Sequence, residues 1–168
     1  MSIIEVNISY KNKDIKQAIS YIVNHIHKLW VALLCFIIVI LEMIIYGFIN
    51  EVTDYNIGLI LVFLFAALIF YGYYFKRPVN GYLKYYEKRK GGQYFFSEDN
   101  IKAIGEDIQS TFCWSLFKKA YSIPSAFLFY DDNNFIYVFP KRCFINNKDI
   151  EQLENLIQKS IKVYKKYN

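Results

Sequence analysis

Two long apolar stretches lie close together along the chain. Residues 29–49 contain 20 uncharged positions out of 21, and residues 57–75 contain no charged residue at all. About 20 helical residues cross the hydrocarbon core of a bilayer. Only helices and closed barrels satisfy their backbone groups in lipid, and two segments cannot form a barrel. The pattern therefore predicts a transmembrane helical hairpin, with the polar residues 50–56 as its connector.

A pair of buried helices in a soluble domain is the competing interpretation of this pattern. Such helices keep charged or polar residues at helical spacing on the face that meets water. Residues 57–75 have no such face, so the sequence favours the membrane hairpin.

Glu42 interrupts the first apolar stretch. A central acidic residue costs about 2.5–3.5 kcal/mol on insertion scales, whereas each Leu, Ile, Phe or Val contributes about −0.3 to −0.6 kcal/mol. More than ten such residues outweigh one carboxylate, so we expect the span to persist and Glu42 to face the second helix or another subunit. Tyr46, one helical turn further on, is placed to share a hydrogen bond with it. Two interpretations stay open. Glu42 either belongs to a proton or ion pathway or to a contact with another membrane protein, or it is an acid tolerated near the outer third of the bilayer and bonded to Tyr46.

The flanking charges predict the orientation of the hairpin. His25, His27 and Lys28 precede the first span, Lys76 and Arg77 follow the second, and the connector has two acids and no base. By the positive-inside rule both termini are then cytoplasmic, and the protein is a multi-pass protein of the inner membrane.

A basic segment follows the second span. Residues 76–90 carry six basic residues and one acid, with tyrosines between them. Each basic residue near an anionic lipid surface contributes about 1 kcal/mol of attraction, so this segment is a candidate for contact with lipid headgroups or a partner. Nucleic-acid binding is not favoured, because no recognition motif accompanies the charge. The candidate contacts are Lys76, Arg77, Lys84, Lys88, Arg89 and Lys90.

The remaining chain predicts a small α+β domain. Gly91 and Gly92 close a helix before a change to strand periodicity. The segment N146-N-K-D-I150 supplies a helix cap, and residues 150–164 then repeat apolar positions every three or four residues, as in an amphipathic helix reaching about residue 166. Residues 4–8 alternate like an edge strand, and residues 14–28 form a helix that leads into the first span. Strands are expected at 93–97, 101–105, 108–114, 119–130, where Pro124 marks a bulge or an edge strand, and 135–139.

The predicted fold class is thus an α+β membrane protein: a two-helix transmembrane hairpin with a cytoplasmic antiparallel sheet closed by a C-terminal helix. The segments are a cytoplasmic strand and helix at 1–28, the hairpin at 29–75, a basic connector at 76–92 and a cytoplasmic domain at 93–168.

The chemistry-bearing residues do not form a recognisable catalytic or metal motif, so we expect no cofactor, no metal and no enzymatic activity. Three widely spaced cysteines indicate reduced thiols, and the acidic pairs after residues 97, 105 and 130 fit solvated turns. Lys141 and Arg142 follow a strand and its proline. They are candidates for binding a phosphate or an acidic partner, although a structural role at the strand end explains them better.

The order of these parts resembles the YcxB-like family of small bacterial membrane proteins. The resemblance rests on the double span, on Y94-F-F-S-E-D-N-I101 and on F127-L-F-Y130, and above all on F139-P-K-R-C-F144 before N146-N-K-D-I-E-Q-L153. Phe139 stands where the family usually has an aliphatic residue, and Cys143 where it has a small one. The resemblance implies a pleckstrin-homology-like architecture and supplies no catalytic residues.

The expected function is therefore binding or regulation by a membrane-tethered domain. The partners expected are membrane lipid and another protein, of which a bacterial toxin met by an immunity protein is one case, and a homo-oligomer is compatible with the sequence. The alternative is a membrane protein that handles lipid or ions through Glu42 and the basic segment.

Overall fold

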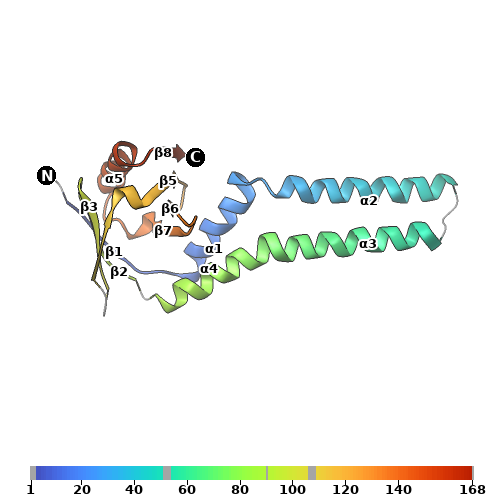
Figure 1. Cartoon of the computed structure of the whole chain (residues 1–168), viewed down its shortest axis with the longest axis horizontal. Coiled ribbons are helices and arrows are strands. Elements are labelled where there is room, and N and C mark those ends of the chain that lie inside the picture. The colour runs from blue at the N-terminus through green and yellow to red at the C-terminus, as the bar shows by residue number, and fades with distance from the viewer. Residues whose placement is uncertain (1–2, 51–53, 90, 106–108, 168) are drawn as a thin grey trace. The chain divides into compact units, whose positions relative to one another are not determined.

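The computed structural model describes residues 3–50, 54–89, 91–105 and 109–167. The chain divides into two compact units (Figure 1). The helical unit comprises residues 19–82, and the α+β unit comprises residues 1–18 together with residues 83–168. Each unit is described by itself.

Two long apolar helices form the helical unit, as predicted. α2 (Trp30–Asn50) and α3 (Asp54–Tyr71) are neighbours in contact with each other. α3 continues through a π-helical turn, η2 (Gly72–Lys76), into α4 (Arg77–Lys88), so that one helix of 35 residues runs from Asp54 to Lys88. The predicted basic connector is therefore helical over most of its length.

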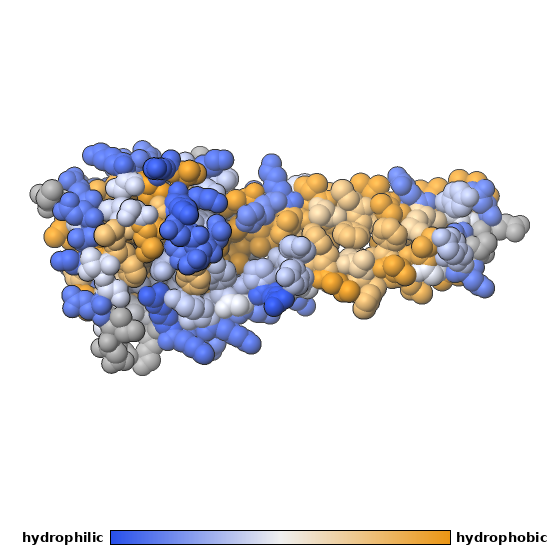
Figure 2. All heavy atoms as spheres, in the orientation of Figure 1, coloured by the Kyte–Doolittle hydropathy of each residue, from blue (hydrophilic) through white to orange (hydrophobic). Residues whose placement is uncertain are grey.

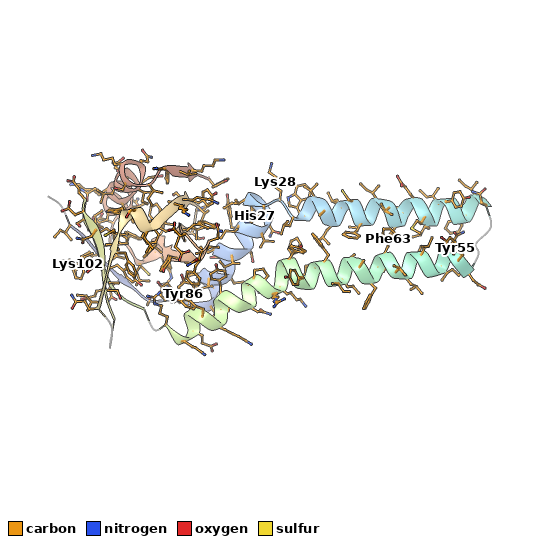
Figure 3. All side chains as sticks on the ribbon, viewed as in Figure 1. His27, Lys28, Tyr55, Phe63, Tyr86 and Lys102 are labelled. Carbon is orange, nitrogen blue, oxygen red and sulfur yellow. The ribbon has the colours of Figure 1, made fainter. Side chains whose placement is uncertain are left out.

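The approach to α2 differs from the predicted helix at residues 14–28. α1 (Asn12–Tyr21) passes into a π-helical turn, η1 (Ile22–Ile26), and the helix ends there. Lys28, labelled in Figure 3, has a left-handed backbone with φ 51°. A non-glycine residue in that region breaks helical geometry, which explains why α2 starts as a separate helix.

The two long helices pack through rows of residues spaced three and four apart. On α2 the less exposed row includes Phe36, Met43 and Gly47, and on α3 it includes Phe63 (Figure 3) and Phe70. The rings of Phe36 and Phe70 are 5.7 Å apart. Rows of residues three and four apart are typical of helices that pack at a shallow crossing angle. In the face seen in Figure 2 the surface of both helices is mostly apolar, as the orange spheres show.

The first sheet of the α+β unit has four antiparallel strands in the order β1–β2–β3–β4. Residues 4–8 form the predicted edge strand, and Val6 lies opposite Tyr94. The strands are β1 (Ile4–Ile8), β2 (Gly92–Phe96), β3 (Asn100–Ile104) and β4 (Gln109–Cys113).

α4 ends before Gly91 and Gly92, as predicted, and β2 begins at Gly92. Gly91 has φ +104°, and a Cβ atom there would lie 2.0 Å from the carbonyl oxygen of Ile8. Glycine is required at such a position because it alone combines that backbone conformation with so close an approach.

The second sheet has the order β7–β6–β5–β8 and corrects one strand prediction. The single strand expected at 119–130 is two antiparallel strands, β5 (Phe117–Ser122) and β6 (Ala126–Asp131). Pro124 lies in the turn between them, which is closed by the bond from Ile123 N to Ala126 O at 2.9 Å. Proline has no N–H for a sheet ladder and suits a turn better than a strand interior. β7 (Ile136–Pro140) then pairs with β6.

The closing helix is shorter than its apolar pattern predicts. α5 (Asn147–Ser160) begins at the predicted cap, where Asn146 Oδ1 accepts from Asp149 N at 2.8 Å. It ends at Ser160, and β8 (Val163–Lys166) then pairs in parallel with β5. One edge of β5 is open to pairing, and residues 163–166 form backbone hydrogen bonds there. The carbonyl groups of a last helical turn would lack such partners.

Aromatic rings form the core of the α+β unit. Phe96, Phe127, Phe129 and Phe139 are almost completely buried, and Leu153 and Ile157 of α5, with Ile161 directly after it, complete the cluster. The protein is therefore an α+β chain with mainly antiparallel sheets and two long apolar helices, in agreement with the coarse prediction.

Candidate functional site

Glu42 lies on an exposed face of α2, whereas the row that faces α3 contains Met43 and Gly47. It makes no hydrogen bond or ion pair to any other residue that the structure describes. Tyr46 is also exposed, at 60%, and its carbonyl oxygen accepts a hydrogen bond from Asn50 Nδ2. Of the two expected orientations of Glu42, the structure thus excludes contact with α3 across the helix pair, and the expected bond to Tyr46 is absent among the described contacts.

The basic residues after α3 are not one uniform patch. Four of them are exposed: Lys76, Arg77, Lys84 and Lys88. The last three lie on one face of α4. Arg77 lies over the ring of Tyr73, 5.0 Å from its centroid. The candidate Lys90 lies outside the described residues.

Arg89 is half-buried and turned into the α+β unit. Its Nη1 donates to the hydroxyl of Tyr85 at 2.9 Å, and its guanidinium lies 5.8 Å from the centre of that ring. Burial alone would lower the pKa of Arg89, but the hydroxyls of the neighbouring tyrosines, Tyr94 first, raise it above its ordinary value. Arg89 therefore keeps its positive charge and contacts Tyr85 of the same domain.

Lys141 and Arg142 lie in η4 (Lys141–Cys143), directly after β7, and both are engaged by the domain itself. Lys141 Nζ is 2.9 Å from Ser122 Oγ and lies over the ring of Phe127, 4.9 Å from its centroid. Burial lowers the pKa of Lys141. A phosphate or an acidic partner would have to displace these contacts.

Arg142 ties the N-terminal segment to the second sheet. Its Nε donates to Asp14 Oδ1 at 3.0 Å, and its Nη2 donates to Asp14 Oδ2 and to the carbonyl oxygen of Ser9, each at 2.6 Å. A bidentate guanidinium–carboxylate pair is among the strongest polar contacts in proteins. Asp14 is the partner that explains Arg142.

Replacing Arg142 by alanine should destabilise the α+β unit by about 1–3 kcal/mol and flatten its stability below pH 4. Burial alone would raise the pKa of Asp14, but the bonds from Arg142 and from Lys11 N lower it. A lowered carboxyl pKa stabilises the fold above its ordinary value near 3.8 and loses that effect as the pH falls further.

Urea unfolding of the full chain in detergent at several pH values measures both effects. Asp14→Asn is the matched control, because it removes the titrating carboxyl itself, whereas Arg142→Ala removes only the partner of that carboxyl. An unchanged slope of stability against pH in both variants would contradict the assignment.

A second polar cluster was not found by sequence reasoning. Glu154 of α5 is buried, accepts a hydrogen bond from the hydroxyl of Tyr164, and forms an ion pair with Lys166 at 2.9 Å. Burial alone would raise the pKa of Glu154, but these two donors lower it. The available signal was an acid on the apolar row of the helix, four residues after Ile150 and three before Ile157.

The prediction of solvated acidic turns holds for Glu98 and Asp99, which are exposed in the turn between β2 and β3, whereas Asp131 is buried at the end of β6 and closes its turn from inside. Asp131 Oδ1 accepts from Asn133 N at 2.9 Å and from Phe135 N at 2.8 Å, while Glu106 and Asp107 lie outside the described residues. His25 stacks on Tyr21, with the ring centres 4.4 Å apart. Within the described ranges, no three His, Cys, Asp or Glu side chains gather as metal ligands would.

The comparison with protein families agrees with the resemblance seen in the sequence. The family model described as YcxB-like protein matches residues 96–157, from the end of β2 into α5. No curated protein and no solved structure matches the chain. The residues that carried the resemblance, Phe139 to Phe144 and the start of α5, fall within the match, and residues 96–157 are therefore identified as a YcxB-like domain.

Proposed function

We propose that the chain is an integral protein of the bacterial inner membrane whose α+β unit is a cytoplasmic binding or regulatory module. The observation that carries this proposal is the contrast between the two units. The long helices leave their apolar side chains exposed. Only 6% of the candidate span in α2 is buried within the protein, and none of the candidate span in the Asp54–Lys88 helix is buried. The α+β unit, in contrast, buries an aromatic core of its own.

Lipid is the solvent that suits such a surface. Residues such as Ile38 on α2 and Phe65 on α3 are more than half exposed, and soluble monomers rarely carry apolar patches of this extent. The 21 residues of α2 rise about 31 Å, which matches the hydrocarbon core of a bilayer. Glu42 costs about 2.5–3.5 kcal/mol there, less than the surrounding aliphatic residues return.

The charges at the ends of the helices support cytoplasmic termini. Lys28 precedes α2, and Lys76 and Arg77 follow α3, at the level where the positive-inside rule counts them. Because α4 continues the same helix, Lys84 and Lys88 lie about 12 Å and 18 Å beyond Lys76 along its axis. A headgroup layer is about 5–7 Å thick. Lipid contact is therefore assigned to Lys76 and Arg77, and contact with a partner to Lys84 and Lys88.

The closing helix α5 packs on two small sheets, which supports the pleckstrin-homology-like architecture that the resemblance implied. Binding is favoured over catalysis by the state of Ser122 and Lys141. Their Oγ and Nζ atoms are 2.9 Å apart, within the reach of a nucleophile and its base. Ser122 is 0% exposed, so a substrate would not reach it. An immunity protein that meets a toxin at the membrane is the binding role that we test.

The alternative role, handling of lipid or ions, requires Glu42 to work with the basic segment. The contact of Phe36 with Phe70 fixes the register of the two antiparallel helices. Glu42 lies six residues beyond Phe36 in one direction and Lys76 six residues beyond Phe70 in the other, so they are about 18 Å apart along the axis. This separation argues against a shared pathway. Glu42→Gln would abolish a pH-dependent flux in liposomes, and the binding role predicts no such flux.

Extraction of the full chain from membranes tests the proposal. An integral protein stays in the membrane pellet after alkaline carbonate and leaves it only with detergent. Co-expression with a membrane-acting bacterial toxin then tests the immunity role, with growth as the readout and Lys84→Glu/Lys88→Glu as the binding-deficient variant. Release by carbonate, or a monodisperse chain in buffer without detergent, would overturn the membrane assignment.

A further inference from the structure

The depth of Glu42 in α2 rules out a simple escape to water. It lies twelve residues after Trp30 and eight before Asn50, so it is about 18 Å and 12 Å from the two helix ends. A glutamate side chain reaches only a few ångströms and cannot bring its carboxyl to the headgroups from that depth. The acid therefore lies within the middle third of the span, about 3 Å from its centre along the helix axis.

Glu42 also has no partner among the described residues of its own helical unit. It is exposed on α2, away from the row that faces α3, and no basic residue lies between Leu29 and Phe75. Acidic residues within membrane spans normally face other protein and pair there. The partner must then come from outside the described part of this chain.

The surface around Glu42 limits what that partner is. Ile38, Leu41 and Ile45 surround it and are each more than half exposed, so the face is apolar except for Glu42 and Tyr46. A protonated carboxyl both donates and accepts a hydrogen bond. Such a group is complementary to itself across a two-fold axis, where one surface patch meets its own copy.

Resting on the membrane insertion proposed above, we propose that two copies of this chain pair in the membrane through α2, with the Glu42 carboxyls hydrogen-bonded to each other at the interface. Cys35 lies seven residues before Glu42, within about 20° on the same face, and is exposed. In a parallel pair the two Cys35 thiols are then brought together across the same axis.

Oxidative crosslinking at Cys35 tests this pairing. Full-length Cys113→Ser/Cys143→Ser, with Cys35 as its only cysteine, is treated with copper phenanthroline in isolated membranes. We expect a disulfide-linked dimer on a non-reducing gel. The matched control moves the cysteine to an exposed residue about 200° around the helix, as Cys35→Ser/Ile37→Cys, and should stay monomeric.

Substitution of Glu42 separates hydrogen bonding from random collision. Glu42→Leu should weaken dimerisation about 3- to 30-fold, the range that interhelical hydrogen bonds produce, whereas Glu42→Gln should retain it because an amide also donates and accepts. Equal crosslinking at positions 35 and 37, no dimer at Cys35, or no effect of Glu42→Leu would each overturn the proposal. If the protein resists carbonate in the same membranes, such a failure leaves the membrane assignment standing.

Discussion

Replacing Phe139 by alanine should lower the free energy of unfolding of the α+β unit by about 3–5 kcal/mol. Phe139 of β7 is 2% exposed and its ring contacts rings from both sheets. The ring centres of Tyr94 and Phe96 in β2 are 5.3 Å and 5.4 Å away, and that of Phe129 in β6 is 4.8 Å away. Removing this ring leaves a cavity where the two sheets meet, and a loss of several kcal/mol is a large part of a typical domain's stability.

Tryptophan emission reports this unfolding in the full chain. Trp114 is buried, its Nε1 donates to the carbonyl oxygen of Ser97 at 2.9 Å, and it contacts Phe96 and Phe129. In a Trp30→Phe background it is the only tryptophan, and urea titration in detergent then follows the α+β unit. Ile145→Ala is the control, because Ile145 is 86% exposed and should change stability by less than about 0.5 kcal/mol. A loss below about 1 kcal/mol for Phe139→Ala would contradict the assigned core.

Removal of one oxygen atom at Tyr86 should cost the same unit about 2–4 kcal/mol. Tyr86 lies in the last turns of α4 (Figure 3), is 3% exposed, and meets the outer edge of β7. Its hydroxyl donates to the carbonyl oxygen of Ile136 at 3.0 Å and accepts from Val138 N at 2.9 Å. Each buried polar group that loses its partner costs about 1–3 kcal/mol. Burial raises the pKa of Tyr86 far above its ordinary value, so the hydroxyl keeps its proton.

Tyr86→Phe is measured by the same titration and by hydrogen exchange at Val138. The amide of Val138 should exchange faster in the variant, because its acceptor is gone. Tyr85→Phe is the matched control: Tyr85 is exposed, and its hydroxyl accepts only from Arg89 among the contacts that the structure gives it. Equal stability losses in the two variants would show that Tyr86 does not hold the edge of β7.

Local sequence signals predicted the elements whose cause is local. The two apolar runs predicted α2 and α3 because their length and lack of charge are sufficient in themselves. Asn146 predicted the start of α5 because asparagine is a preferred helix cap. Gly91 and Gly92 predicted that α4 ends before them because glycine commonly terminates helices. The edge strand at residues 4–8 followed from simple alternation.

The features that were missed depend on partners distant in sequence. The pairing of β8 with β5 ended α5 at Ser160, although the apolar period continued to Tyr164. Arg142 follows the proline as predicted, but its role depends on Asp14, which lies 128 residues earlier. Tyr86 was one of many tyrosines until the edge of β7 gave its hydroxyl two partners. Such contacts follow from the fold and carry no local pattern.

Labelling with a membrane-impermeant maleimide tests the central claim, that α2 and α3 cross the bilayer and leave the α+β unit inside. Cys113 on β4 is exposed and serves as the inside probe in Cys35→Ser/Cys143→Ser. Tyr55, at the start of α3 and 73% exposed, becomes the outside probe as Tyr55→Cys in a chain with all three cysteines replaced by serine. In intact cells the account predicts reaction at position 55 and none at Cys113 until the cells are lysed. Reaction at Cys113 in intact cells, or protection of position 55 until lysis, would contradict it.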